Sequence, residues 1–100
     1  MVASVEIVLT GAATTAGELK IVFTPQGGET VEIRTPVAAG APAAAAASEL
    51  AAALIRATAP DYAVTVASPA RIAMASGKSR RPFRVKLAAE PPNGLSLRFD

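Results

Sequence analysis

Residues 19–34 read LKIVFTPQGGETVEIR, and this stretch decides the fold. Every second residue from Leu19 to Phe23 is large and apolar, which is typical of a strand with one buried face. The same alternation resumes at Val31, after two consecutive glycines that tolerate the positive φ angles of a tight turn. The stretch therefore predicts a β-hairpin.

Alternating apolar and polar residues recur on both sides of this hairpin, and Gly or Pro residues punctuate them. A Pro-Pro-Asn-Gly sequence at residues 91–94 is a strong turn signal before the final alternating run. The alternation predicts strands at about residues 4–10, 18–24, 30–35, 62–67, 71–75, 82–88 and 94–99.

One segment, residues 42–58, has helical spacing instead. Pro42 suits the first helical turn, where its missing N–H costs nothing, and Pro60 prevents the helix from continuing. We expect the narrow apolar face of this helix to pack on a sheet, with a partner-facing surface as the alternative. The residues that share this face by their spacing are Ala43, Ala47, Leu50, Leu54 and Ala57.

These segments predict an α+β fold: one β-rich domain over residues 1–100, with six to seven mostly antiparallel strands and one alanine-rich helix packed on the sheet. Of the 51 apolar residues, 24 are alanine, which leaves 27 larger side chains to form the core. A fully buried Val, Leu, Ile or Phe contributes roughly 1.5–3 kcal/mol, and alanine contributes far less. The expected core is thin, so association between chains would add stability.

The composition excludes several kinds of site. The chain has no Cys and no His, so thiolate and imidazole metal sites and His-activated nucleophiles are impossible. Without Trp and with one Tyr, it has few platforms for stacking nucleotide bases. It has no signal-peptide pattern and no apolar run long enough to span a membrane. We expect a soluble, intracellularly made protein.

No set of residues in the sequence indicates catalysis. Glu49 and Asp61 could pair in space, but two carboxylates without further context are a weak signal. The glycines at 27–28 and 94 do not lead from a strand into a helix, as a phosphate-binding loop would require. The sequence therefore predicts no enzyme activity, no metal, no cofactor and no catalytic residue.

The charge of +2 is distributed unevenly. Residues 1–70 carry three basic and six acidic groups, whereas residues 71–100 carry seven basic and two acidic groups. This basic segment could be a solvated face, a protein interface or a contact for nucleic acid. The candidate interface residues are Arg71, Lys78, Arg80, Arg81, Arg84 and Lys86.

The order of motifs resembles a module of bacteriophage contractile-tail sheath proteins. Residues 5–23 read VEIVLTGAATTAGELKIVF, which contains the Thr-Gly-x-Ala-x-x-x-Gly segment that leads into a hairpin in that family. A Val-x-x-Gly step, an alanine-rich helix and a Tyr-Ala-Val-Thr-Val-Ala strand follow at residues 37–67. The segments FRVKLAA at 83–89 and NGLSLR at 93–98 are similar to the closing strands of the module.

This resemblance implies a phage structural module that is used alone, as a tail component or a head decoration protein, and it implies no catalytic residues. The segment from Ser68 to Arg81 departs from the pattern as an apparent insertion. A complete sheath protein is several times longer than 100 residues and has terminal arms that link its subunits, so this chain does not match one in full.

The leading hypothesis is a non-enzymatic virion structural protein that forms homo-oligomers and contacts other virion proteins, through a basic segment beside strands able to form sheet edges. One alternative is a capsid decoration protein that binds the major capsid protein. Another is a small nucleic-acid-binding protein that uses residues 71–86, which we consider the weaker of the two. An enzyme or ligand-binding domain would require a polar pocket around Asp61 or Glu49.

Overall fold

The computed structural model describes residues 1–58, 61–77 and 80–100. Each predicted element is present, with ends within two residues of the predicted range. The elements are β1 (Ser4–Gly11), β2 (Gly17–Pro25), β3 (Val31–Val37), α1 (Ala43–Thr58), β4 (Tyr62–Ser68), β5 (Arg71–Ser76), β6 (Phe83–Leu87) and β7 (Leu95–Phe99).

The strands form two sheets, where the sequence predicted one. The four-stranded sheet has the order β4-β5-β1-β7 and the three-stranded sheet has the order β3-β2-β6, with antiparallel pairing throughout. The predicted hairpin is β2–β3, in which Leu19 pairs with Thr35 and Ile21 pairs with Ile33. Alternation reveals which face of a strand is buried, but the choice of partner depends on contacts between distant residues. The fold class, α+β and rich in β-strands, is confirmed.

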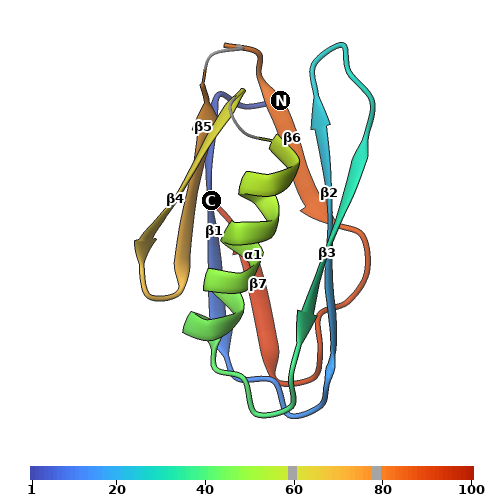
Figure 1. The fold of residues 1–100 in the computed structure, drawn as a ribbon, viewed down its shortest axis with the longest axis vertical. Coiled ribbons are helices and arrows are strands. Elements are labelled where there is room, and N and C mark those ends of the chain that lie inside the picture. Colours follow the sequence, from blue (N-terminus) through green and yellow to red (C-terminus); the bar gives the residue numbers. More distant parts are fainter. Residues whose placement is uncertain (59–60, 78–79) are drawn as a thin grey trace.

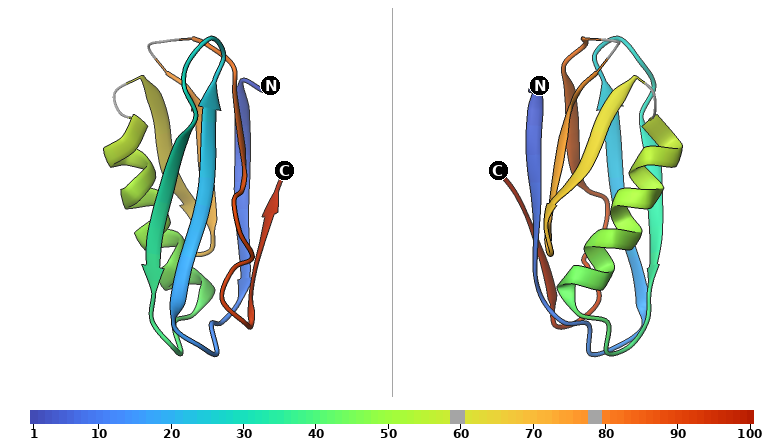
Figure 2. Two further views of the ribbon diagram at one scale, coloured as in Figure 1. Left: turned by 90° about the vertical axis from the view of Figure 1, so that its right-hand side faces the viewer. Right: turned by 60° about the vertical axis from the view of Figure 1, so that its left-hand side comes forward.

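The helix closes one side of the molecule and a strand extension closes the other. Helix α1 lies between β3 and β4, the outer strands of the two sheets, and packs on both (Figure 1). On the opposite side, shown in Figure 2, the segment before β1 approaches β6. There Val2 and Phe83 exchange two backbone hydrogen bonds of 2.9 Å. The sheets and the helix thus enclose a single core.

Three of the four aromatic side chains meet inside this core. Phe23 from β2 and Phe83 from β6 belong to one sheet, and Tyr62 from β4 belongs to the other. The ring centroids of Phe23 and Tyr62 lie 5.0 Å apart, and those of Tyr62 and Phe83 lie 5.3 Å apart, both edge to face. Edge-to-face pairs add to the stabilisation that burial alone provides, so this cluster ties the two sheets together.

The buried face of α1 is wider than the predicted stripe. Ala46, Ala51 and Ala53 are buried together with most of the predicted positions. The expectation for Ala57 is wrong, because it is exposed and Thr58 is buried in its place, where its hydroxyl donates to the Leu54 carbonyl at 2.7 Å. Small side chains on so much of the helix allow it to sit close to both sheets.

Strand β5 lies within the segment that departs from the sheath-like pattern. It pairs with β1 on one side and with β4 on the other, so it is an interior strand of its sheet. Ile72 and Met74 on this strand are fully buried. Strand β5 of the apparent insertion is therefore an integral part of the core.

Candidate interaction surface

Strand β6 presents two cations on the outer face of the three-stranded sheet. Its alternation buries Phe83 and leaves Arg84 and Lys86 exposed. In the ladder with β2, Arg84 lies opposite Thr24 and Lys86 lies opposite Val22. Because β6 is an outer strand, both side chains stand at a sheet edge.

The two cations border an open depression on this face. Its volume is about 370 Å³, and the remaining lining comes from Val22, Thr24 and Thr30. The two threonine hydroxyls lie 2.9 Å apart and hydrogen-bond to each other. Neither Arg84 nor Lys86 has an ion pair with any described residue. Two unneutralised cations beside two hydroxyls suit an oxyanion, such as a carboxylate or a phosphate.

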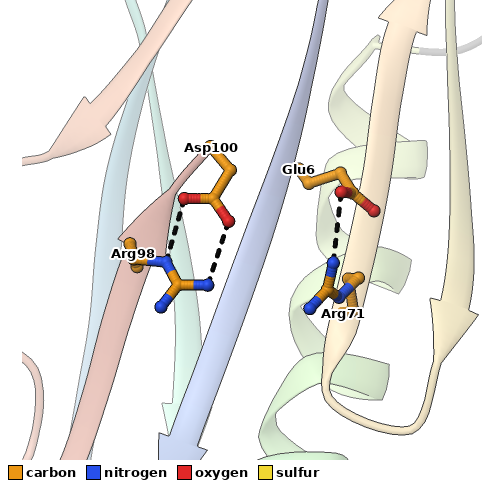
Figure 3. A network of polar contacts seen from close by, with 4 residues as sticks. All are labelled: Glu6, Arg71, Arg98 and Asp100. Atoms are coloured by element: carbon orange, nitrogen blue, oxygen red, sulfur yellow. Dashed lines mark hydrogen bonds and ion pairs between the residues drawn. The ribbon is translucent and has the colours of Figure 1, made fainter.

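The structure separates Arg71 from these cations. Arg71 begins β5 in the other sheet, and its guanidinium donates to the Glu6 carboxylate at 3.3 Å (Figure 3). Both side chains are about 40% exposed, so the pair contributes little to stability. Arg71 has its acidic partner within the chain and does not extend the β6 surface.

The two arginines before β6 lie in the β5–β6 loop. Arg81 donates to the Gln26 carbonyl in the β2–β3 turn at 3.3 Å, and the Ser76 hydroxyl donates to the Arg81 carbonyl at 2.8 Å. Arg80 is exposed and has a positive φ of 54°. Both arginines therefore lie at the end of the sheet where β6 begins. Lys78, which belongs to the predicted set, lies outside the described residues.

Two ion pairs between residues two positions apart escaped the sequence interpretation. Arg98 donates to both carboxylate oxygens of Asp100, at 2.9 and 3.0 Å (Figure 3). This contact raises the pKa of Arg98 and lowers the pKa of Asp100. Glu32 likewise bonds Arg34 and raises the pKa of that guanidinium. Opposite charges two residues apart share a strand face, which is the signal that could have found both pairs.

An apolar groove between α1 and the end of β3 also escaped prediction. Its volume is about 440 Å³, and the Glu49 carboxylate is its only ionisable lining group. Small side chains at exposed helix positions produce no periodic pattern, so the sequence did not indicate this groove. The other lining residues are Pro36, Val37, Ala38, Ala41, Ala45 and Ala46.

The two carboxylates considered for catalysis do not meet. Glu49 lies in the first half of α1, and Asp61 follows the end of that helix. From Glu49 to Thr58 the helix alone rises about 14 Å. Among residues 1–58, 61–77 and 80–100, no group of three potential metal ligands occurs.

The one helix in the described part of the chain, Ala43–Thr58, is too short to cross a membrane. Comparison with known proteins adds no relative. No protein-family model matches the sequence, and neither a curated protein nor a solved structure matches it significantly.

Proposed function

We propose that this chain is a non-enzymatic structural protein of a phage virion, which assembles in many copies on the tail or head. The observation that carries the proposal is the pair of exposed cations, Arg84 and Lys86, on an outer strand and without an acidic partner among the described residues. Cations of this kind at a sheet edge suit contact with a carboxylate-bearing protein surface. The resemblance of residues 5–98 to a sheath module supplies the virion context.

Two further features support assembly. Strands β6 and β7 are both outer strands. Val2 covers the edge of β6 at Phe83, and beyond that residue each strand has an edge that a neighbouring chain can approach. The large apolar side chains Val2, Val31, Ile55 and Val66 are between 41% and 49% exposed. Contacts between copies would bury such side chains and add apolar area to a core built largely from alanine.

Mass spectrometry of purified virions tests this proposal. We expect the chain in the particles at many copies, and its absence would overturn the proposal. Charge reversal in Arg84→Glu/Lys86→Glu should reduce its incorporation, because the variant repels an acidic partner. The matched control is Arg84→Lys/Lys86→Arg, which keeps both charges and should be incorporated normally.

Decoration of a capsid and incorporation into a tail are two forms of this function. A decoration protein binds the major capsid protein and should appear on heads that lack tails. A tail component should appear on isolated tails. Fractionating the two particle types before mass spectrometry separates these outcomes.

Nucleic-acid binding is the second candidate, and the oxyanion chemistry of the β6 depression favours it. Against it, Arg71 lies in the other sheet and is neutralised by Glu6, so the cations of segment 71–86 do not form one continuous stripe. Binding through phosphates would weaken steeply with salt, since each contact releases counterions. Absence of DNA binding at low salt would remove this candidate.

A further inference from the structure

The molecule is elongated, with a longest dimension of 37 Å, and its loops gather at two opposite ends (Figure 1). At the first end the β2–β3 turn meets the β5–β6 loop, where the Gln26 N–H donates to the Pro82 carbonyl at 2.9 Å. At the second end the β1–β2 loop meets the β6–β7 loop, where the Thr14 N–H donates to the Asn93 carbonyl at 2.7 Å. The start of α1 also lies there, since the Ala13 N–H bonds the Ala41 carbonyl.

The two ends carry opposite charge. We call the first the basic end, because four cations outnumber three acids among its described residues. We call the second the acidic end, because three acids outnumber two cations. The groups are Arg56, Arg80, Arg81 and Arg84 with Glu29, Glu32 and Asp61 at the basic end, and Glu18, Glu49 and Glu90 with Lys20 and Arg34 at the acidic end.

The acidic end contains the apolar groove between α1 and β3. The groove is lined mainly by proline, valine and alanine side chains, and Glu49 stands beside them. Neither Glu49 nor Glu90 has an ion pair with a described residue. An apolar surface beside an unneutralised carboxylate suits a partner with an exposed apolar side chain next to a cation.

The basic end of the same chain offers that combination. Val2 is 45% exposed, and its backbone is fixed by the two hydrogen bonds to Phe83. Arg84 follows Phe83 in β6, and it borders the same surface depression as Val2. An apolar side chain and an exposed cation therefore lie side by side at the end opposite the groove.

We propose that the groove between α1 and β3 is the docking site for the basic end of a second copy, with Arg84 of one copy facing Glu49 of the next. The inference rests on the proposed assembly function and names the two surfaces that meet. Because the two surfaces are different, the contact is head to tail, and its repetition gives a ring or an open filament. A two-fold dimer would instead use the same surface twice.

Sedimentation of purified protein tests the proposal with two complementary variants. Arg84→Glu removes the cation of the basic end, and Glu49→Lys removes the carboxylate of the groove. Each variant alone should self-associate at least about tenfold more weakly than the wild type, the change that ~1.4 kcal/mol produces. An equimolar mixture should recover association, since the carboxylate introduced at position 84 of one variant then faces the ammonium introduced at position 49 of the other.

The matched control reverses a charge away from both surfaces. Arg98→Glu alters an exposed arginine on β7 of the four-stranded sheet and should associate like the wild type. A wild type that is monomeric at all concentrations would overturn the proposal. So would variants that weaken association but show no recovery on mixing, because Arg84 and Glu49 would then meet different partners.

This outcome is separable from that of the virion experiment. If the chain is absent from virions but the variants complement each other, the proposed function fails and the head-to-tail contact stands. If the chain is present in virions but mixing restores nothing, the function stands and the contact is wrong.

Discussion

The basic end and the acidic end of this protein are packed in different ways. Beneath the basic end, Phe23, Tyr62 and Phe83 form an aromatic cluster that joins the two sheets. Beneath the acidic end, Ala43, Ala46 and Ala47 bring the helix close to the sheets. Large side chains stabilise the first region through buried area, whereas the second depends on close fit. The difference indicates that the basic end resists opening, and that the acidic end contributes less to stability but tolerates added volume poorly.

The aromatic cluster should be the most sensitive part of the molecule. Replacing Phe83, which is fully buried, in Phe83→Ala should lower the free energy of unfolding by about 3–5 kcal/mol. The half-buried Phe99 provides the matched control, and Phe99→Ala should cost clearly less. Urea denaturation measures the free energy of unfolding of both variants. Equal losses would mean that Phe83 in the aromatic cluster contributes no more to stability than the half-buried Phe99.

Close packing of the helix should show as intolerance of added volume. Ala47 is fully buried on α1, so Ala47→Leu should destabilise the fold by about 1–3 kcal/mol through overpacking. Ala44 is exposed on the same helix, and Ala44→Leu should change stability by less than about 0.5 kcal/mol. If both substitutions have the same effect in urea denaturation, the helix is not closely packed on the sheets.

Each region also contains one buried hydroxyl without a hydrogen-bond partner among the described residues, that of Tyr62 at the aromatic cluster and that of Thr35 on β3. A buried hydroxyl that makes no hydrogen bond costs free energy, so Thr35→Val should stabilise the protein by about 1 kcal/mol. Thr65, exposed on β4, is the control, and Thr65→Val should have little effect. A lower melting temperature for Thr35→Val would show that this hydroxyl does have a partner.

The smallest expected effect concerns the pair Arg98–Asp100. The hydrogen bonds and charge of Arg98 lower the pKa of Asp100 below its usual value of 3.8. A depressed pKa in the folded state contributes stability above the unfolded pKa, and this contribution is lost as the pH falls through the folded pKa. Titration of the Asp100 carboxyl carbon by NMR should therefore give a pKa below 3.8 that rises in Arg98→Ala. An unchanged pKa in the variant would mean that the pair does not persist in solution.

The sequence was sufficient for the elements and insufficient for their arrangement. Alternation around Leu19 and Phe83, and the prolines at 42 and 60, located each strand and the helix to within two residues. Pairing could not be predicted in the same way, because β1 joins β5 and β7, which are both distant in sequence. Local patterns contain no information on such contacts, so the division into two sheets was missed.

The candidate site was predictable only in part. The alternation of β6 correctly placed Arg84 and Lys86 together on a polar face. The grouping of Arg71 with them failed, since residues close in a charge run can enter different sheets. The groove beside Glu49 could not be predicted at all, because it forms where the helix and β3 meet.

The head-to-tail contact is the central claim, and cross-linking tests it most directly. The chain has no cysteine, so Val2→Cys/Ala45→Cys would introduce one thiol near each of the two surfaces that we expect to meet. With a short bismaleimide, the double variant should give a ladder of dimers, trimers and larger species, while each single variant should give nothing beyond a dimer. A double variant that gives no species larger than those of the single variants would contradict the account.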